Sequence, residues 1–330
     1  MKIAVIGAGA WGTALANLLS ENDHTTTLWA FEPDVVESVN AHAENKRFLS
    51  GVPLHRDLRA TSGMETALEG AELAFFVAPS HVLRQVAASA KRHMPAGVPL
   101  VVATKGIDKE RLSLMTDVAA EEIPGHPIVA LSGPSFAIEV ANHLPTAIVA
   151  ASLDDAAAKL TQQSLSTSAF RVYTQHDVTG VELGGALKNV MAVATGISDG
   201  LALGFNARAA LITRGLAEMT RLGLKMGAEA ETFAGLAGMG DLVLTCTGSL
   251  SRNRSVGIEI GRGATLSEVL AGRETVAEGV VTSETAKLLA EKHGVEMPIV
   301  NAVHRVLFEK QPARWALVEL MTRSLKGERD

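Results

Sequence analysis

The first half of the chain alternates short apolar runs with segments of helical periodicity. Apolar runs typical of buried parallel strands occupy residues 2–6, 25–31, 72–78, 98–103, 127–131, 146–151 and 169–173. Helical patterns separate them at residues 11–20, 82–93, 111–122 and 154–165. This alternation predicts an α/β domain over residues 1–178, built on a doubly wound parallel sheet with helices on both faces.

The second half of the chain has a different pattern. Beyond residue 178 the strand-like runs disappear, and helical patterns follow at residues 179–198, 207–224, 265–271, 282–293 and 299–309. We therefore expect a mostly α-helical substrate and catalytic domain over residues 179–330. Ligands of open α/β sheets bind beyond the carboxyl ends of the strands, so the active site is expected in the crevice between the two domains.

Composition narrows the class of protein. A formal net charge of −6 argues against general binding to nucleic acid or to membrane surfaces. An uncharged apolar stretch of about 18 residues, the usual length of a membrane span, is not found. The single cysteine, Cys246, permits no internal disulfide and suits a reducing compartment, so we expect a cytoplasmic protein. The histidines show no metal-ligand spacing, and we expect no metal site.

A glycine motif follows the first predicted strand. Gly7, Gly9 and Gly12 form the pattern G-x-G-x-x-G, and a predicted helix begins within it. This context is typical of a Rossmann-type fold that binds the pyrophosphate of a dinucleotide at the helix N-terminus. The apolar run before the motif could also be taken for a signal peptide, but the glycines favour a strand, a turn and a helix. The motif predicts NAD or NADP as cofactor.

The position that separates NAD from NADP lies about 20 residues beyond the last glycine of the motif. Glu32 occupies this position, directly after Phe31, and an acid here favours the free ribose hydroxyl of NAD. Glu32 could equally be a solvated turn residue. The choice between the two cofactors therefore stays open.

One lysine interrupts an otherwise apolar helical pattern. Lys188 is the only charged residue in the run 183–197, and lysine is rarely buried unless it is paired or functional. The alternative is a surface lysine whose stem lies along apolar neighbours. Asn189 adds a hydrogen-bonding group, and Gly184 and Gly185 permit close approach of a ligand or of other chain segments.

Two further clusters carry groups suited to an anion. Ser251, Arg252, Asn253 and Arg254 form either an anion site or a solvated basic turn, and Asp241 precedes them in an apolar run. Lys105 and the segment Ser132–Gly133–Pro134–Ser135 end two predicted strands, where ligands of such sheets bind. A surface lysine and a plain helix cap are the alternatives for these two.

Several segments together resemble the NAD(P)-dependent glycerol-3-phosphate dehydrogenase family. They are GALKNVMAVATGISDGLALGFN at 185–206, followed by NARAALITRGLAEM, GLAGMGDLVLTCT, SRNR and VEMPI. The resemblance covers nearly the whole chain. It implies reversible hydride transfer between NAD(P)H and dihydroxyacetone phosphate, which gives sn-glycerol 3-phosphate for phospholipid synthesis.

The resemblance also implies roles for individual residues. Lys188 is implied as the acid and base, with Lys105 and Asp241 beside it. The implied substrate site contains Lys105, Gly133, Ser135, Lys188, Asn189, Asp241, Ser251, Arg252 and Asn253. The implied cofactor site contains Gly7, Gly9, Ala10, Trp11, Gly12, Phe31, Lys105, Ala137, Arg252, Val276 and Glu278. The family often has a basic residue at the position of Phe31, and this departure weakens any preference for NADP.

Three other functions can be weighed against this one. An enzyme of the 6-phosphogluconate type would have lysine and asparagine one helical turn apart, whereas here they are adjacent and position 192 is alanine. A nucleotide-sugar dehydrogenase needs a reactive thiol, and Cys246 lies in an apolar run. A regulator that only binds the dinucleotide needs no buried lysine. The largely apolar helical domain favours a homodimer.

Overall fold

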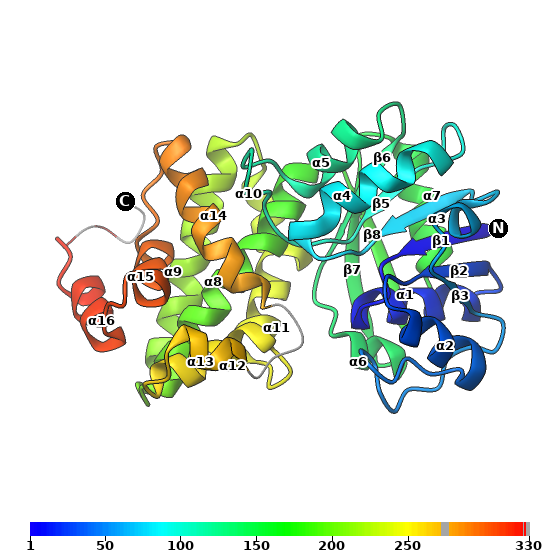
Figure 1. Ribbon diagram of the computed structural model, residues 1–330. Helices are drawn as coiled ribbons and strands as arrows, with labels where there is room; N and C mark the ends of the chain where they lie inside the picture. The colour runs from blue at the N-terminus through cyan, green and yellow to red at the C-terminus, as the bar shows by residue number, and fades with distance from the viewer. Residues whose placement is uncertain (272–276, 326, 328–330) are drawn as a thin grey trace. The chain divides into compact units, whose positions relative to one another are not determined.

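The computed structural model describes residues 1–271, 277–325 and 327. The chain forms two compact units (Figure 1). Unit 1 contains Met1–Gly185 and Ala228–Asp241, and unit 2 contains Ala186–Gly227 and Leu242–Asp330.

Unit 1 is built on one eight-stranded sheet with the order β3-β2-β1-β4-β5-β6-β7-β8. The strands are β1 Lys2–Ile6, β2 Thr25–Trp29, β3 Arg59–Thr61, β4 Leu73–Phe76, β5 Leu100–Val102, β6 Ile128–Ser132, β7 Thr146–Ala151 and β8 Phe170–Gln175. All neighbouring strands are parallel except β6 and β7. The predicted doubly wound, Rossmann-type sheet is confirmed. The short edge strand β3 was not predicted.

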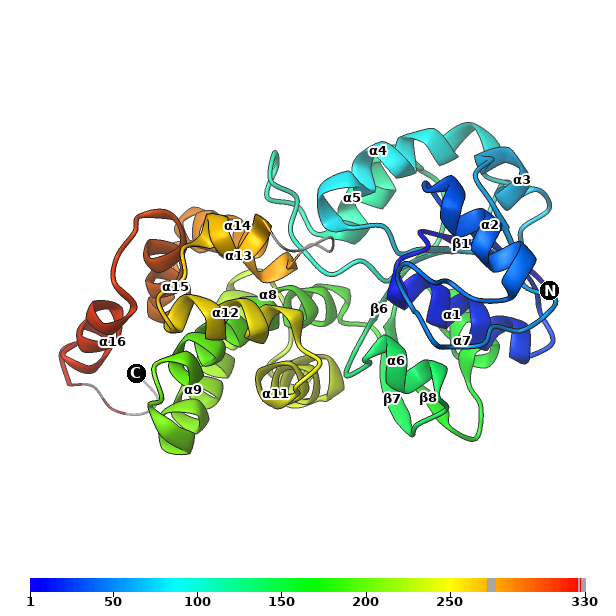
Figure 2. The same ribbon diagram turned by 60° about the horizontal axis from the view of Figure 1, so that its bottom comes forward.

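The sheet of unit 1 is buried on both faces. In β1, Ile3 and Val5 belong to one apolar core and Ala4 and Ile6 to the other, because successive side chains of a strand point to opposite faces. Helices α1, α6 and α7 cover one face, and α3, α4 and α5 cover the other (Figure 2). The helices of unit 1 are α1 Ala10–Glu21, α2 Pro33–His42, α3 Met64–Leu68, α4 Ser80–Ala90, α5 Met115–Glu122, α6 Ala137–Ala141, α7 Asp155–Leu165 and α10 Ala230–Ala234, together with the single turns Lys91–His93 and Leu236–Gly240.

In its described residues unit 2 is helical, as expected for the second half of the chain. Helix α8, Val178–Gly200, begins in unit 1 and continues into unit 2. The other helices are α9 Gly204–Lys225, α11 Asp241–Thr247, α12 Arg252–Gly261, α13 Leu266–Ala271, α14 Glu278–Lys292, α15 Pro298–Phe308 and α16 Ala313–Met321. No helix among the described residues is long and apolar enough to cross a membrane.

The two units divide the chain differently from the boundary expected at residue 178. Residues 228–241 return to unit 1, where Ala237 joins an apolar cluster with residues of β6 and β7. The Asp177 carboxylate accepts a hydrogen bond from the backbone N–H of Glu229 at 2.9 Å. This contact holds the start of the returning segment close to the end of β8. Hydrophobic periodicity does not reveal a return of this kind, because it reports only local structure.

Glu182, in the first turns of α8, is a buried carboxyl group. It accepts hydrogen bonds from the backbone N–H of Thr116, at 2.9 Å, and from the Thr116 hydroxyl. Burial raises the pKa of Glu182 to about 7, although both hydrogen bonds oppose this shift. Because the folded protein holds this proton more tightly than the unfolded chain, the contribution of Glu182 to stability is fully present below its ordinary pKa and is lost as pH rises through about 7.

We therefore expect Glu182→Gln to reduce the fall of unfolding free energy with rising pH, while Glu218, whose pKa burial also raises to about 7, keeps its own contribution. The ionised carboxyl group costs roughly 3 kcal/mol of unfolding free energy, because its pKa is about 7 in the folded protein and 4.5 ordinarily. Chemical denaturation at intervals from pH 4.5 to pH 8 measures the slope for both proteins. Equal slopes for the variant and the parent would show that Glu182 does not carry this dependence.

Candidate active site

The glycine motif forms a tight turn between β1 and α1. Gly7 has φ +122°, a conformation that side chains rarely adopt, and a Cβ there would lie 2.9 Å from the backbone at Val77 and Ala78. A Cβ on Gly12 would lie 1.8 Å from the carbonyl oxygen of Gly7. Gly9 differs, because a Cβ there would meet nothing within 4 Å. Gly7 and Gly12 therefore shape the turn, and Gly9 leaves open space above it.

The residues around this turn fit a bound dinucleotide. The indole Nε1 of Trp11 is buried without a hydrogen-bond partner, and α1 has no acidic residue in its first turn. Asn45 holds the turn in place by donating one hydrogen bond to the carbonyl oxygen of Ala8 and another to the Thr13 hydroxyl, both at 2.8 Å. A helix N-terminus of this kind attracts phosphate groups.

Phe31 and Glu32 lie just beyond β2, at the positions where a Rossmann-type fold contacts the ribose of its cofactor. Phe31 is 77% exposed, and Glu32 is the N-cap residue of α2 without a side-chain hydrogen bond to that helix. The nearby Arg47 forms an exposed ion pair with Asp34. These positions are compatible with either cofactor.

We expect Gly9→Ala to weaken cofactor binding without unfolding the protein. Gly9 has φ −62° and ψ 176°, which alanine adopts freely, so the added methyl group causes no strain in the folded chain. The methyl group instead occupies the space over the turn. The dissociation constant for NADH should rise about tenfold or more, since close backbone approach to the pyrophosphate is lost. Titration by nicotinamide fluorescence and a melting curve test the two parts separately, and unchanged affinity would contradict the assignment.

A second group of predicted residues meets at the ends of β5 and β6. The ammonium of Lys105 donates to the Asp241 carboxylate at 2.7 Å and to the carbonyl oxygen of Gly133 at 3.0 Å. The Ser135 hydroxyl donates to the same carbonyl oxygen at 3.0 Å. Asp241 is fully buried, whereas the Lys105 side chain is 18% exposed. Unit 1 thus holds a paired cation whose charge is still partly accessible.

Small residues surround this pair. A Cβ on Gly185 would lie 2.5 Å from the Ser132 hydroxyl and 3.4 Å from the Lys105 side chain. The Ser132 hydroxyl is buried without a hydrogen-bond partner. Ala137, assigned to the cofactor, begins α6 directly after this segment. Because Gly185 has no side chain, it leaves space for the side chain of Lys105.

Lys188 is buried in unit 2. Only 7% of the residue is exposed, and its ammonium donates to the hydroxyl of Thr245, on α11, at 2.8 Å. The burial expected from the apolar helical pattern is therefore confirmed. Thr245 was not singled out in the sequence. It lies four residues beyond Asp241, so the two share one face of α11, which is the signal that could have identified it.

Asn189 and Asn253 link α8 to α12 and α14. The Asn253 amide donates to the side-chain oxygen of Asn189 at 2.9 Å, and its own oxygen accepts from the backbone N–H of Gly279 at 2.9 Å. Both asparagines are buried. Gly279 follows Glu278, which is assigned to the cofactor. Val276, assigned with it, lies outside the described residues.

Arg252 begins α12 and is exposed to solvent. Ser251 caps this helix by accepting a hydrogen bond from the backbone N–H of Arg254 at 3.2 Å. Desolvation by neighbouring atoms lowers the pKa of Arg252, and the Glu278 carboxylate counteracts this shift. Arg254 differs from Arg252, because its guanidinium pairs with Asp199. Of the two arginines, Arg252 is the exposed one.

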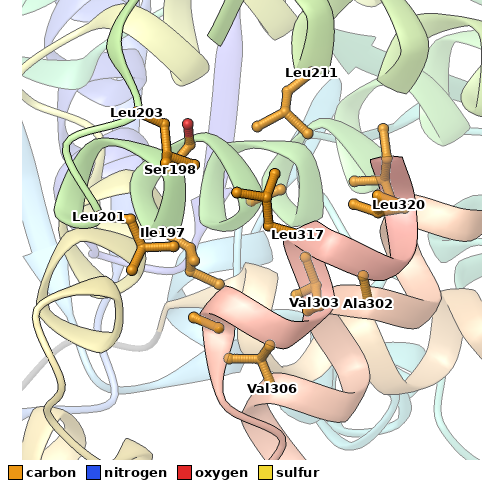
Figure 3. Close-up of a pocket in the computed structure, with 14 residues that line it drawn as sticks. Ile197, Ser198, Leu201, Leu203, Leu211, Ala302, Val303, Val306, Leu317 and Leu320 are labelled. Atoms are coloured by element: carbon orange, nitrogen blue, oxygen red, sulfur yellow. The ribbon is translucent and has the colours of Figure 1, made fainter. Parts of the chain in front are cut away.

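A separate cavity in unit 2 is lined by apolar side chains of α8, α9, α15 and α16, with the Ser198 hydroxyl as its one polar side chain (Figure 3). Its volume is about 50 Å³. It contains none of the predicted site residues, and it offers no charge for a phosphate. Among the described residues, no cluster of histidine, cysteine or acidic side chains could hold a metal ion.

Each unit thus contains some of the predicted site residues. Unit 1 holds the glycine turn and the group Lys105, Gly133, Ser135 and Asp241. Unit 2 holds Lys188, Asn189, Ser251, Arg252, Asn253 and Glu278. Unit 1 thus contributes one lysine, and unit 2 contributes a second lysine and an exposed arginine, residue types that can act on protons and bind phosphate.

Comparison with known proteins agrees with this chemistry. The family profiles described as NAD-dependent glycerol-3-phosphate dehydrogenase N-terminus and C-terminus match residues 2–158 and 177–318. The chain is 56% identical over 333 residues to glycerol-3-phosphate dehydrogenase (NAD(P)+) of Geobacter sulfurreducens, covering 99% of both chains. It is 50% identical over 331 residues to the protein of that name from Myxococcus xanthus, again covering 99% of both.

A solved structure is similar along the whole chain. The glycerol-3-phosphate dehydrogenase of Coxiella burnetii superimposes with a TM-score of 0.94 at 42% sequence identity, over 98% of this chain and 99% of that one. Profile, sequence and structure point to the same group of enzymes. The chain belongs to the NAD-dependent glycerol-3-phosphate dehydrogenase family.

Proposed function

We propose that this protein interconverts dihydroxyacetone phosphate and sn-glycerol 3-phosphate with NAD(P)H or NAD(P)+, and so supplies glycerol 3-phosphate for phospholipid synthesis. The observation that carries the proposal is the buried Lys188, whose ammonium is held by the Thr245 hydroxyl. A buried lysine is costly unless it is paired or functional. The reaction needs such a group, since reduction of a ketone leaves a negatively charged oxygen that must be protonated.

The cofactor is assigned to the residues around the glycine turn. Gly7, Gly9 and Gly12 would carry the pyrophosphate, with Trp11 beside it. Phe31 would face the adenosine end, and the remaining cofactor contacts are assigned to Ala10, Lys105, Ala137, Arg252, Val276 and Glu278. When bound, the nicotinamide supplies the hydride chemistry of this reaction, which belongs to the cofactor rather than to the protein. The fit of this turn rests on the open space at Gly9 and the unpartnered indole N–H of Trp11.

Protein groups are assigned to the proton and to the charges of the substrate. Lys188 donates a proton to the oxygen on C2 during reduction and accepts it, as the neutral amine, during oxidation. Lys105, held by Asp241, polarises the same carbonyl group. Asp241 keeps the ammonium of Lys105 in one position. The remaining substrate contacts are assigned to Gly133, Ser135 and Asn189.

The phosphate of the substrate is assigned to the start of α12. Arg252 supplies a guanidinium that can bind two phosphate oxygens, and Ser251 and Asn253 flank it. Arginine is suited to this role because it stays charged at any working pH.

We further propose a cytoplasmic homodimer that does not bind nucleic acid. The lone, buried Cys246 suits a reducing compartment, and the net charge of −6 disfavours nucleic acid. Unit 2 exposes large apolar side chains, including Phe205 at 80%, Trp315 at 64% and Met321 at 76%, which suits a subunit interface. Sedimentation equilibrium would test the dimer directly.

Nicotinamide absorbance provides the test of activity. The protein is mixed with NADH or NADPH and then with dihydroxyacetone phosphate, dihydroxyacetone or no ketone, and oxidation of 6-phosphogluconate and of a nucleotide sugar is tested with NAD+ and NADP+. We expect turnover with dihydroxyacetone phosphate and much weaker turnover with the unphosphorylated ketone. Binding of the dinucleotide without any turnover would favour a regulator instead. Turnover of 6-phosphogluconate or the nucleotide sugar alone would favour the other two enzyme classes.

A further inference from the structure

One partly buried carboxylate in unit 2 joins two arginines from different helices. The Asp199 side chain, near the end of α8, is 11% exposed. One of its oxygens accepts from Nε and Nη2 of Arg208, on α9, at 2.9 and 2.6 Å. The other accepts from Nε of Arg254, on α12, at 2.8 Å, with Nη2 of the same guanidinium at 2.7 Å. Each arginine thus makes a two-pronged, charge-assisted contact with one oxygen of the carboxylate.

Helix α8, which carries Asp199, and helix α12, which carries Arg254, pack against each other with little side-chain material between them. The Cα of Gly257 lies 2.9 Å from the position that a Cβ on Gly196 would take, and the Cα of Gly261 lies 2.9 Å from the corresponding position at Gly200. Glycine pairs permit this closeness but supply no interlocking side chains. Close packing of this kind sets the separation of the two helices, and polar contacts between side chains add directional constraints to it.

Directional contacts between side chains also hold α12 against α8. The hydrogen bond between Asn189 and Asn253 is one such contact. The charged pair between Asp199 and Arg254 is another. Arg254 lies in the first turn of α12, two residues beyond Arg252. A shift of Arg254 therefore moves the guanidinium assigned to the phosphate.

We propose that Asp199 is a positioning residue, which fixes the start of helix α12 through Arg254 and thereby aims Arg252 at the phosphate of the substrate. The proposal rests on the proposed function, since it assigns Asp199 to phosphate binding and not to proton transfer. Loss of this pair costs affinity for the phosphorylated ketone. The chemical step and the unphosphorylated ketone depend on it much less.

The two arginines on Asp199 provide a matched pair of variants. Arg254→Lys and Arg208→Lys each replace one two-pronged contact with a single point charge. Only Arg254 belongs to the helix that carries Arg252. We expect Arg254→Lys to raise the KM for dihydroxyacetone phosphate about tenfold, since a displacement below 1 Å suffices for such a loss. The kcat should stay within about threefold of the parent value.

Arg208→Lys should lower the melting temperature by a similar amount and leave the KM for dihydroxyacetone phosphate unchanged. Asp199→Asn should reproduce the KM effect of Arg254→Lys, and kcat/KM for unphosphorylated dihydroxyacetone should stay at the parent value in all three variants. If Asp199→Asn does not fold, the two lysine variants still decide the matter, because both keep the carboxylate.

Two results would overturn the proposal. An equal rise in KM for Arg208→Lys would indicate general loosening of unit 2, and an unchanged KM for Arg254→Lys would separate Asp199 from phosphate binding. Both are read on a parent protein that turns over dihydroxyacetone phosphate. A parent without that activity would instead contradict the proposed function itself.

Discussion

Replacement of Lys188 by methionine is expected to lower kcat by about two to four orders of magnitude, the usual loss when a general acid is removed. Methionine has a similar unbranched length and fills the buried position beside Thr245, but it carries no proton. Because Lys188 is assigned to the substrate and not to the cofactor, the dissociation constant for NADH should not change. Steady-state kinetics and a cofactor titration on the same preparation measure the two quantities.

Two further variants sharpen this result. Lys188→Arg should rescue little activity, because a guanidinium holds its protons too tightly to act as the acid and base. Lys225→Met, at the exposed end of α9, removes a lysine without touching the site and should behave like the parent. A near-normal kcat in Lys188→Met would refute the assignment and direct attention to Lys105, whose ammonium is paired with Asp241.

Replacement of Arg252 by alanine should raise the KM for dihydroxyacetone phosphate roughly thirtyfold. This corresponds to about 2 kcal/mol, the lower end of the range for a lost charge-assisted pair, and the lower end applies because Arg252 is exposed. The unphosphorylated ketone should lose much less. The comparison of the two ketones isolates the contact with the phosphate.

Arg262→Ala is the matched control for this change. Arg262 is an exposed arginine at the opposite end of the same helix, so it tests general loss of positive charge from α12. A KM for NADH that rises together with the KM for both ketones in Arg252→Ala would assign Arg252 mainly to the cofactor. An effect confined to the phosphorylated ketone would assign it to the substrate.

Much of the sheet and of the helical unit could be predicted from local pattern. Strand β4, and β1 from Ile3 onward, are buried on both faces, so their side chains are apolar without interruption. The three-residue edge strand β3, Arg59–Thr61, is too short and too polar to give that signal. Helix α12 was missed for a related reason, since it carries two arginines and two glycines in ten residues.

The glycine motif and the isolated Lys188 identified the chemistry because each is informative by itself. A turn with φ above 0° favours glycine, and a charged residue within an apolar helix is rarely buried unless it is paired or functional. The partners of the site residues could not be predicted in this way, because they are distant in the sequence. Lys105 and Asp241 are 136 residues apart, and Lys188 and Thr245 are 57 apart.

The sequence alone therefore determined the class of fold, the dinucleotide turn and the residue types of the site, because these depend on local periodicity and on the properties of single side chains. Only the tertiary structure decided which of two nearby arginines is presented to solvent. Arg252 and Arg254 look alike in the run SRNR, yet Asp199, 55 residues before Arg254 in the sequence, pairs with Arg254 and not with Arg252. That selection depends on the approach of α12 to α8 through their glycines, a contact that no local pattern encodes.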